Sequence, residues 1–375
     1  MENMGMKGLF GGVYYDKKVL VTGNTGFKGS WLSTWLIELG AKVYGISNGI
    51  PTRPRSLFEE NGLAKRMEYF ETDIREAEKV KDLIRRINPD FVFHLAAQPI
   101  VLKSYEDPIE TMTTNIIGTV NILDALRTLE NQCIAVMITS DKCYDNVEWV
   151  WGYRETDALG GKDPYSASKA GAELMIKTYH HSYFSKPESK IRLSAVRAGN
   201  VIGGGDWAEN RIVPDCIRAW EKNDTVEIRS PFSTRPWQHV LEPLSGYLQT
   251  GKMLSEKIEL NGQAFNFGPD GEQTKTVRDL IEALAIHWDG ENKSLYKIIP
   301  PPEFHEAGLL KLNCDKAANL LQWRPVLHFE ETSKLTSLWY KNANLDGNDA
   351  YEYSVFQINE YILLAKERNL IWCRN

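Results

Sequence analysis

Apolar residues occur in short runs along the first half of the chain, and each run is followed by a segment with helical spacing. The runs predict strands at residues 19–22, 42–46, 67–70, 91–97, 134–139 and 191–201. The segments between them predict helices at residues 30–39, 76–87, 114–129 and 164–179. Strands that alternate with helices are typical of an α/β fold with a doubly wound parallel sheet.

The alternation weakens after about residue 200, where proline and tryptophan become more frequent. The elements predicted there are a strand at 265–268 and helices at 277–287, 332–342 and 351–368. A change of this kind marks a domain boundary. We therefore expect a Rossmann-type domain at 15–200, with returning segments near 236–268, and a smaller C-terminal α/β lobe over most of 201–375.

Composition narrows the class of protein. The chain has 375 residues, of which 42% are hydrophobic and 25% charged, as in soluble globular proteins. No run approaches the roughly 18 apolar residues that span a bilayer, and no signal peptide is evident. A net charge of −6 argues against nucleic-acid binding but allows an anionic ligand in a basic pocket. Five dispersed cysteines indicate free thiols in a cytoplasmic protein, with no metal site or disulfide.

Three glycines follow the first predicted strand, at positions 23, 26 and 29. Glycine permits a sharp turn, a close approach of backbone to phosphate, and tight packing of helix on strand. The helix that opens here offers unpaired N–H groups and a partial positive charge, which suit a diphosphate. A glycine triplet alone is weak, but its place between strand and helix favours dinucleotide binding. The spacing differs from the Gly-x-Gly-x-x-Gly of most Rossmann dehydrogenases.

Two positions leave the cofactor contacts open. The second strand ends without the acid that would hold the ribose of NAD, and Arg53 and Arg55 follow it. These arginines are consistent with an NADP site or with a solvated loop. Asp73, after the third strand, is equally consistent with a contact to adenine and with an N-cap for the next helix.

The fourth predicted strand ends in two small residues, Ala96 and Ala97, which let a ligand lie close. His94 stands inside this apolar run. We interpret it as a hydrogen-bonded core histidine rather than a catalytic one.

Candidate catalytic groups follow the fifth strand. Ser140, Asp141 and Lys142 come at its C-terminal end, where open α/β sheets bind ligands, although a simple turn is the alternative. Tyr165 and Lys169 stand four residues apart on one helix face. A neighbouring cation is expected to lower the pKa of a tyrosine by roughly 1–3 units, which makes it a usable base near neutral pH.

Further basic residues occur after the sixth strand. Gly203, Gly204 and Gly205 indicate a loop that approaches a ligand closely. Arginine suits phosphate groups through its planar fork, and three arginines fall in this region, although each is also consistent with a surface charge: Arg211, Arg229 and Arg235.

Together these residues resemble the extended short-chain dehydrogenase/reductase enzymes that act on nucleotide sugars. The resemblance rests on the glycine motif, Asp73, residues 94–97, Ser140, Tyr165 and Lys169. Within that family, residues 140–142, 197–207 and 235–240 are similar to those of the CDP-glucose 4,6-dehydratases. The similarity extends from about residue 17 to about residue 324.

This resemblance implies NAD as cofactor and CDP-glucose as substrate. Asp73 would then hold adenine and Lys169 the nicotinamide ribose. The implied cofactor contacts are Gly23, Thr25, Gly26, Phe27, Gly29, Asp73, Ile74, Leu95, Ala96, Ala97, Tyr165 and Lys169. The implied substrate contacts are Asn200, Trp207, Arg211 and Arg235.

The resemblance also implies a reaction. Tyr165 would deprotonate the sugar's 4-hydroxyl with Ser140 sharing the hydrogen bond, and Asp141 would protonate the departing 6-hydroxyl. Lys142 would be either the base for the C-5 proton or a cation that stabilises the enolate. The product would be CDP-4-dehydro-6-deoxy-glucose, for deoxysugar and O-antigen biosynthesis.

Three other functions are weighed against this one. A UDP-sugar dehydratase that inverts C-5 also carries an Asp-Lys pair but lacks the stretch at residues 203–207. A nucleotide-sugar 4-epimerase needs Tyr165 and Lys169 but not the pair at 141 and 142. A catalytically silent dinucleotide sensor would typically lose Tyr165 or Lys169. The family resemblance further implies a homodimer or homotetramer.

Overall fold

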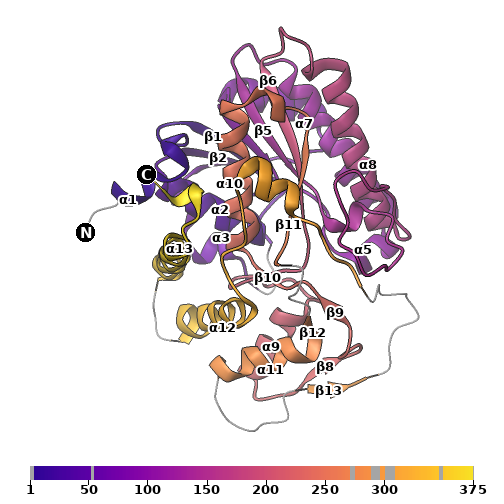
Figure 1. The fold of residues 1–375 in the computed structure, drawn as a ribbon, viewed down its shortest axis with the longest axis vertical. Coiled ribbons are helices and arrows are strands. Elements are labelled where there is room, and N and C mark those ends of the chain that lie inside the picture. The colour runs from indigo at the N-terminus through magenta and orange to yellow at the C-terminus, as the bar shows by residue number, and fades with distance from the viewer. Residues whose placement is uncertain are drawn as a thin grey trace.

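The computed structural model describes residues 4–51, 55–270, 275–288, 296–299, 309–345 and 349–374. Figure 1 shows a parallel sheet with helices on both faces and a smaller lobe below it. The smaller lobe contains α9, α11 and four short strands.

The predicted doubly wound α/β fold is confirmed by a seven-stranded sheet in the order β11-β6-β5-β4-β1-β2-β3. Every neighbouring pair is parallel. The strands are β1 (Lys18–Thr22), β2 (Lys42–Ser47), β3 (Glu68–Glu71), β4 (Phe91–His94), β5 (Cys133–Ile138), β6 (Ile191–Ala198) and β11 (Ala264–Phe267).

Two apolar cores enclose the sheet because alternate strand residues face opposite sides. On β1, Val19 and Val21 belong to one core and Leu20 to the other. Helices α2 (Phe27–Glu38) and α10 (Leu241–Glu256) contact each other and the sheet on the first side. The helices of the second side are α4 (Ala77–Ile87), α7 (Gly118–Leu126) and α8 (Pro164–Tyr179).

Several boundaries differ from those predicted. The fourth strand stops at His94. Beyond it the chain turns away from the sheet, and the backbone N–H of Ala96 donates to the Thr22 hydroxyl at 3.2 Å. The strand predicted at 191–201 is divided into β6 and β7 (Val201–Ile202). Asn200 between them has a left-handed φ of 51°, which ends the extended run.

The helix predicted at 114–129 begins with a π-helical turn, η3 (Thr113–Ile117). The Asn115 amide, which lies in this turn, donates to the Ser168 hydroxyl at 2.8 Å and to the Gln98 carbonyl at 3.1 Å. It therefore joins η3 to α8 and to the loop after β4. Two short helices before it were not predicted, α5 (Val101–Glu106) and α6 (Pro108–Met112).

The smaller lobe is built around α9 (Ile212–Glu221) and α11 (Val277–Trp288). Beside them, β8 (Val226–Ile228) pairs in parallel with β13 (Tyr296–Ile298), and β9 (Thr234–Arg235) pairs with β12 (Lys275–Thr276). The remaining strand, β10, spans Gln238–His239.

The chain then returns toward the sheet. Helix α12 (Phe329–Leu345) packs on α11, and α13 (Ala350–Glu367) packs on α2. The C-terminal residues thus cover the first domain as well as the lobe. Short helical turns complete the chain at α1 (Met4–Lys7), η1 (Leu9–Gly12), α3 (Leu57–Glu60), η2 (Leu63–Lys65), η4 (Asp141–Cys143), η5 (His180–Phe184), η6 (Ile258–Leu260), η7 (Ala317–Leu321) and η8 (Ile371–Cys373).

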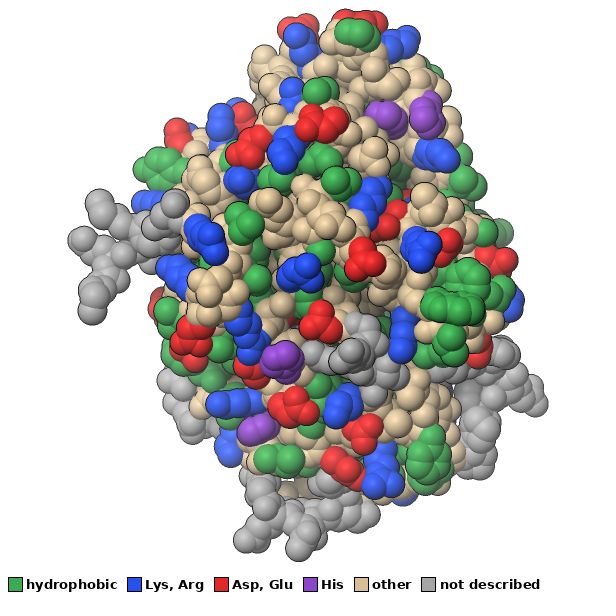
Figure 2. Space-filling model, in the orientation of Figure 1, with side chains coloured by type: hydrophobic (Ala, Val, Ile, Leu, Met, Phe, Trp, Pro, Cys, Tyr) green, Lys and Arg blue, Asp and Glu red, His purple; other side chains and the backbone are tan. Residues whose placement is uncertain are grey.

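The surface in Figure 2 carries basic and acidic side chains side by side over the visible face. Among the described residues, no helix is both long enough and apolar enough to cross a membrane. All five cysteines are free thiols, as expected from their spacing.

Candidate active site

A large cavity lies between the sheet domain and the lobe. Its volume is about 1170 Å³, and residues from the glycine motif, the ends of β4 and β5, the start of α8 and the start of α9 line it. Pockets for a single ligand commonly measure roughly 300–1,000 Å³. The cavity therefore has room for a cofactor and a substrate together.

The glycine motif forms one wall. Gly23 has a φ of +71°, and a Cβ on it would lie 2.8 Å from the Ala96 Cα. A Cβ on Gly29 would lie 2.1 Å from the Gly23 carbonyl oxygen. Helix α2 begins here without a side-chain cap and without an acidic residue in its first turn. Its N–H groups and partial positive charge are thus available to a diphosphate.

All the residues expected to contact the cofactor line this cavity, including Thr25, Phe27, Ile74, Leu95 and Ala97. The Thr25 hydroxyl donates to the Gly49 carbonyl at 2.8 Å and thereby ties the motif to the end of β2. The narrow turn and the uncapped helix together fit a dinucleotide.

Asp73 lines the cavity, and its side chain is held by Arg75, two residues further along the chain. Its carboxylate accepts from the Arg75 backbone N–H at 2.8 Å and from the Arg75 guanidinium. These bonds lower the pKa of Asp73. The alternative role as helix N-cap is wrong, because Glu76 occupies the cap position of α4.

The arginines after β2 do not form a 2′-phosphate site in the described part of that loop. The Arg55 guanidinium stacks on Trp207 at 4.7 Å and pairs with Glu221 at 3.6 Å. Arg55 does not line the cavity. Arg53 falls outside the described residues.

His94 is a core histidine, as predicted. One ring nitrogen lies 2.7 Å from the Thr22 hydroxyl and the other 3.1 Å from the Thr119 hydroxyl. Burial lowers the pKa of His94 to about 3, so that the ring stays neutral.

Asp141 is buried beside Ser140 at the end of β5. The Ser140 hydroxyl donates to Asp141 Oδ1 at 2.9 Å, and Oδ2 has no hydrogen-bond partner among the described residues. Gly199 makes room for this carboxylate, because a Cβ there would lie 1.8 Å from Oδ2. Asp141 therefore presents one oxygen that is buried and unused by the protein.

Tyr165 and Lys169 also face the cavity, from the first turns of α8. The Asp163 side chain caps this helix and accepts from the Ser166 N–H at 2.9 Å, which fixes the direction of Tyr165. The Lys169 ammonium lies 5.9 Å from the centre of the Tyr165 ring. Both side chains are buried.

The expected lowering of the Tyr165 pKa is wrong for this structure. Burial raises the pKa of Tyr165 to about 12, although a hydrogen bond with Ser140 opposes the change. Burial also lowers the pKa of Lys169 to about 8. The spacing in the sequence shows that Tyr165 and Lys169 are neighbours. It does not show how deeply both side chains are buried, and this burial determines their pKa values.

A buried ion pair supports these groups from behind. Arg197 on β6 donates from Nε and Nη2 to the Glu173 carboxylate, each at 2.8 Å. Arg197 also donates to the Tyr144 hydroxyl at 2.6 Å, and Glu173 accepts from Thr139 at 2.5 Å. Glu173 follows Lys169 by one helical turn, so the network joins α8 to the strand end that carries Ser140.

Lys142 lines the cavity and is half-buried. Its backbone N–H donates to the Ser140 hydroxyl at 3.2 Å, which orients the turn. No hydrogen bond or ion pair of its ammonium group is found with the described residues. Lys142 is therefore available to a ligand.

Three of the four expected substrate contacts line the opposite half of the cavity, namely Asn200, Arg211 and Arg235. Trp207 does not. Its indole N–H donates to Glu60 at 3.0 Å, and its ring packs on Tyr340 away from the cavity. Trp207 is buried, and its ring also contacts the Arg55 guanidinium, so the ring serves packing here.

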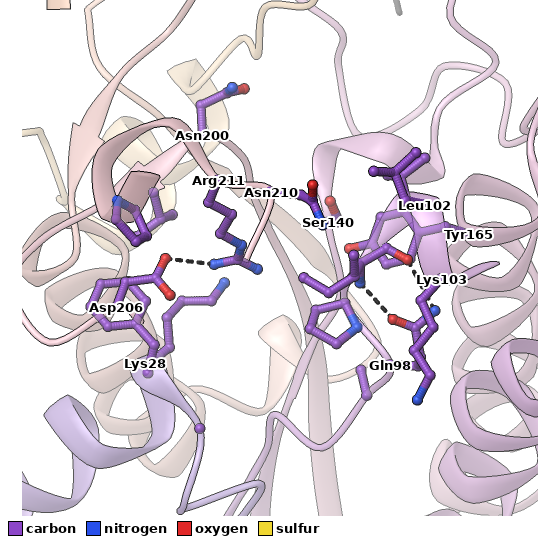
Figure 3. Close-up of a pocket in the computed structure, with 18 of the residues that line it drawn as sticks. Lys28, Gln98, Leu102, Lys103, Ser140, Tyr165, Asn200, Asp206, Asn210 and Arg211 are labelled. Atoms are coloured by element: carbon purple, nitrogen blue, oxygen red, sulfur yellow. Dashed lines mark hydrogen bonds and ion pairs between the residues drawn. The ribbon is translucent and has the colours of Figure 1, made fainter. Parts of the chain in front are cut away.

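Asp206 and Lys28 are among the charged cavity residues that were not predicted as site residues. Asp206 accepts from Arg211 at 2.9 Å, and Lys28 extends from the glycine motif toward both (Figure 3). One sequence signal was available for Lys28. A lysine in the first turn of a helix without any acid opposes the helix dipole, and so has no evident structural purpose.

Comparison with known families agrees with this geometry. A family model described as GDP-mannose 4,6 dehydratase matches residues 20–336. The chain belongs to this dehydratase family. A family member, the CDP-glucose 4,6-dehydratase of Salmonella typhimurium, is 46% identical over 360 residues, covering 93% of this chain and 97% of that one.

Two solved structures have the same fold as this chain. The UDP-glucose 4-epimerase of Thermus thermophilus, in complex with NAD, superimposes with a TM-score of 0.74 at 26% identity, over 87% of this chain and 99% of that one. A dTDP-glucose 4,6-dehydratase of Streptomyces venezuelae shares the fold with a TM-score of 0.72 at 21% identity, over 86% and 97% of the two chains.

Proposed function

We propose that the protein is a CDP-glucose 4,6-dehydratase. The observation that carries this proposal is the meeting of Tyr165 with Asp141 and Lys142 in one cavity. A tyrosine alone serves oxidation and reduction of a sugar hydroxyl, whereas a carboxylate and an amine beside it also serve loss of water. The 46% identical relative, which bears this name, supports CDP-glucose as the substrate.

NAD is the cofactor that fits the cavity. Gly26 and Phe27 would hold its diphosphate at the start of α2, Asp73 would approach adenine, and Lys169 would hold the nicotinamide ribose. When bound, NAD supplies a hydride acceptor and, later in the cycle, a hydride donor. The NAD complex of the 26% identical Thermus epimerase supports this choice.

Tyr165 begins the reaction by taking the proton of the 4-hydroxyl while the C-4 hydride leaves. The Ser140 hydroxyl, hydrogen-bonded to the phenol, opposes the effect of burial on the pKa of Tyr165. The positive nicotinamide ring of bound NAD would lower this pKa further, so that the phenolate is available as the base. The resulting 4-ketone makes the proton on C-5 acidic.

Asp141 and Lys142 direct the elimination. The proton that Tyr165 took from the 4-hydroxyl passes through the Ser140 hydroxyl, which is hydrogen-bonded to both side chains, to the Asp141 carboxylate. Asp141 gives this proton to the departing 6-hydroxyl, and water leaves. The Lys142 side chain takes the proton from C-5, and the hydride that left C-4 is added at C-6. Lys142 then returns the proton to C-5, which gives CDP-4-dehydro-6-deoxy-glucose.

A substrate panel tests the proposal. The purified protein is incubated with CDP-, UDP-, dTDP- and GDP-glucose, and a 4-keto-6-deoxy sugar is detected by its ultraviolet absorbance under alkali. We expect product from CDP-glucose in preference to the others. Product from UDP-glucose alone would instead indicate a UDP-sugar dehydratase, and a change at C-4 without the absorbance would indicate an epimerase.

The two parts of the chain are assigned separate tasks in this proposal. Residues 15–200, with the returning segments near 236–268, bind the dinucleotide, and most of 201–375 binds the nucleotide sugar. We also propose a homodimer or homotetramer in the cytoplasm that supplies deoxysugar biosynthesis. Exposed apolar side chains on adjoining helices support self-association: Ile109 on α6, Ile117 on η3 and Leu174 on α8.

A further inference from the structure

Lys28 is a charged residue whose position the fold itself does not explain. It is the second residue of α2, where the helix dipole disfavours a cation, and no acid stands in that first turn. Its ammonium lies 6.0 Å from the centre of the Tyr247 ring. No hydrogen bond or ion pair of this ammonium is found with the described residues.

The charges that face Lys28 do not balance. Lys169 and Arg211 repel it, and burial and this repulsion lower the pKa of Lys28 to about 8. Asp141 and Asp206 attract it, but Asp206 is engaged by Arg211 and Asp141 accepts from Ser140. Three cations thus face two carboxylates, and one positive charge is left toward the cavity.

The Lys28 side chain points toward the part of the cavity that contains Arg211 and Asp206 (Figure 3). Figure 3 shows Lys28 beside Asp206 and Arg211, across a gap from Ser140 and Tyr165. The start of α2 already offers backbone N–H groups to the cofactor's diphosphate. A second diphosphate, bound near Arg211, would therefore belong to the substrate.

We propose that Lys28 binds the diphosphate of the nucleotide-sugar substrate together with Arg211, and that the glycine motif thus serves both ligands. The inference rests on the proposed function, which supplies a diphosphate on the substrate side. The bound dianion brings negative charge next to Lys28 and so favours its protonated form. At a pH where Lys28 is partly neutral before binding, binding is therefore accompanied by proton uptake.

Affinity measurements test this role. The parent and Lys28→Met are titrated calorimetrically with CDP, UDP, dTDP, GDP and the corresponding nucleosides, and with ADP-ribose as probe of the cofactor half. For the nucleoside diphosphate that binds the parent most tightly, we expect a loss of about 10- to 100-fold, typical of a charge-assisted hydrogen bond. The affinities for the nucleoside and for ADP-ribose should change by less than about twofold.

Two controls exclude a general loss of structure. Lys28→Met should melt no lower than the parent, since it removes an unbalanced charge, and Lys28→Arg should restore binding relative to the Met variant. Lys103→Met is the matched control, because Lys103 also borders the cavity but pairs with Glu110 at 2.9 Å. It should leave the diphosphate affinity unchanged.

Proton uptake provides a second readout. In buffers of different ionisation enthalpy at about pH 8, the parent should take up about half a proton or more on binding the diphosphate. Lys28→Met should take up clearly less, since only Lys169, whose pKa is also about 8, then remains partly neutral in the cavity. Unchanged diphosphate affinity in Lys28→Met, or a loss confined to ADP-ribose, would overturn the inference while leaving the proposed function intact. Failure of every nucleoside diphosphate to bind the parent would overturn both.

Discussion

At the scale of single residues, the site depends on a contact between Gly199 and Asp141. The buried carboxylate occupies the space that any side chain at 199 would fill, because a Cβ there would lie 1.8 Å from Asp141 Oδ2. The absence of a side chain directly after β6 thus leaves the space that the acid after β5 occupies.

This contact gives a direct prediction. Gly199→Ala should displace the Asp141 carboxylate and reduce turnover by about 10²-fold or more, since small misplacements of catalytic groups are costly. Binding of NADH, measured by fluorescence, should remain within about twofold. Gly268→Ala is the control, because its Cβ would meet its nearest neighbour at an ordinary 3.6 Å. Parental turnover in Gly199→Ala would show that Asp141 can move without consequence.

The residue scale also shows what a sequence can and cannot predict about a site. The spacing of Tyr165 and Lys169 on one helix, and the place of Ser140 at a strand end, follow from local periodicity and were predicted. The raised pKa of Tyr165 depends on burial by distant segments. The position of Trp207 outside the cavity depends on its packing against Tyr340. Neither can be inferred from neighbouring residues alone.

At the scale of elements, the strands were predicted within a few residues because continuous apolar runs identify buried parallel strands. The helix at Pro164–Tyr179 was predicted at its observed bounds, since Asp163 and Pro164 mark its start. The π-turn around Asn115 was not predicted, because its polar contacts to Gln98 and Ser168 are made across the fold.

Helix α10 is joined to the C-terminal segment by a buried carboxyl group. Glu242 accepts from the backbone N–H groups of Val326 at 2.9 Å and Leu327 at 2.5 Å, and lies 2.9 Å from the Tyr361 hydroxyl. Burial raises the pKa of Glu242 to about 7. The folded protein therefore retains a proton that the unfolded chain loses near pH 4.3.

The sign of the pH effect follows from this difference. Between about pH 4.3 and pH 7 the folded state binds more protons, so the contribution of Glu242 to the free energy of unfolding falls as pH rises, by about 3 kcal/mol. Glu242→Gln imitates the protonated form and should flatten the dependence of Tm on pH over that range. It should also melt above the parent at pH 8. Identical slopes of Tm against pH in the parent and in Glu242→Gln would contradict a raised pKa of Glu242. Glu282 is exposed, so Glu282→Gln serves as the control and should leave the slope unchanged.

At the scale of the whole molecule, the cavity is completed by both parts of the chain. The sheet domain supplies Tyr165 and Asp141, and the lobe side supplies Arg211 and Asp206. The return of β11 to the sheet and of α13 to α2 ties the two parts together. In the sequence, the weakening of the strand–helix alternation predicted the lobe. It did not predict that α13 docks on α2.

Self-association is predicted at this scale as well. Leu174 is 49% exposed on α8, beside the helical turns that carry other exposed apolar side chains. If this face joins two copies, Leu174→Glu should shift the protein toward monomers in sedimentation velocity experiments, because it buries a charge. Ile286→Glu, on α11 at 69% exposure, should not. A parental sedimentation profile for Leu174→Glu would place the interface elsewhere.

In the proposed reaction, one sugar is oxidised at C-4, loses water and is reduced at C-6 within the same cavity. CDP-glucose labelled with deuterium at C-4 is therefore converted in ordinary water, and the product is examined by NMR and mass spectrometry. We expect the label at C-6 of the 4-keto-6-deoxy product. A product without deuterium at C-6, or label that remains at C-4, would contradict it.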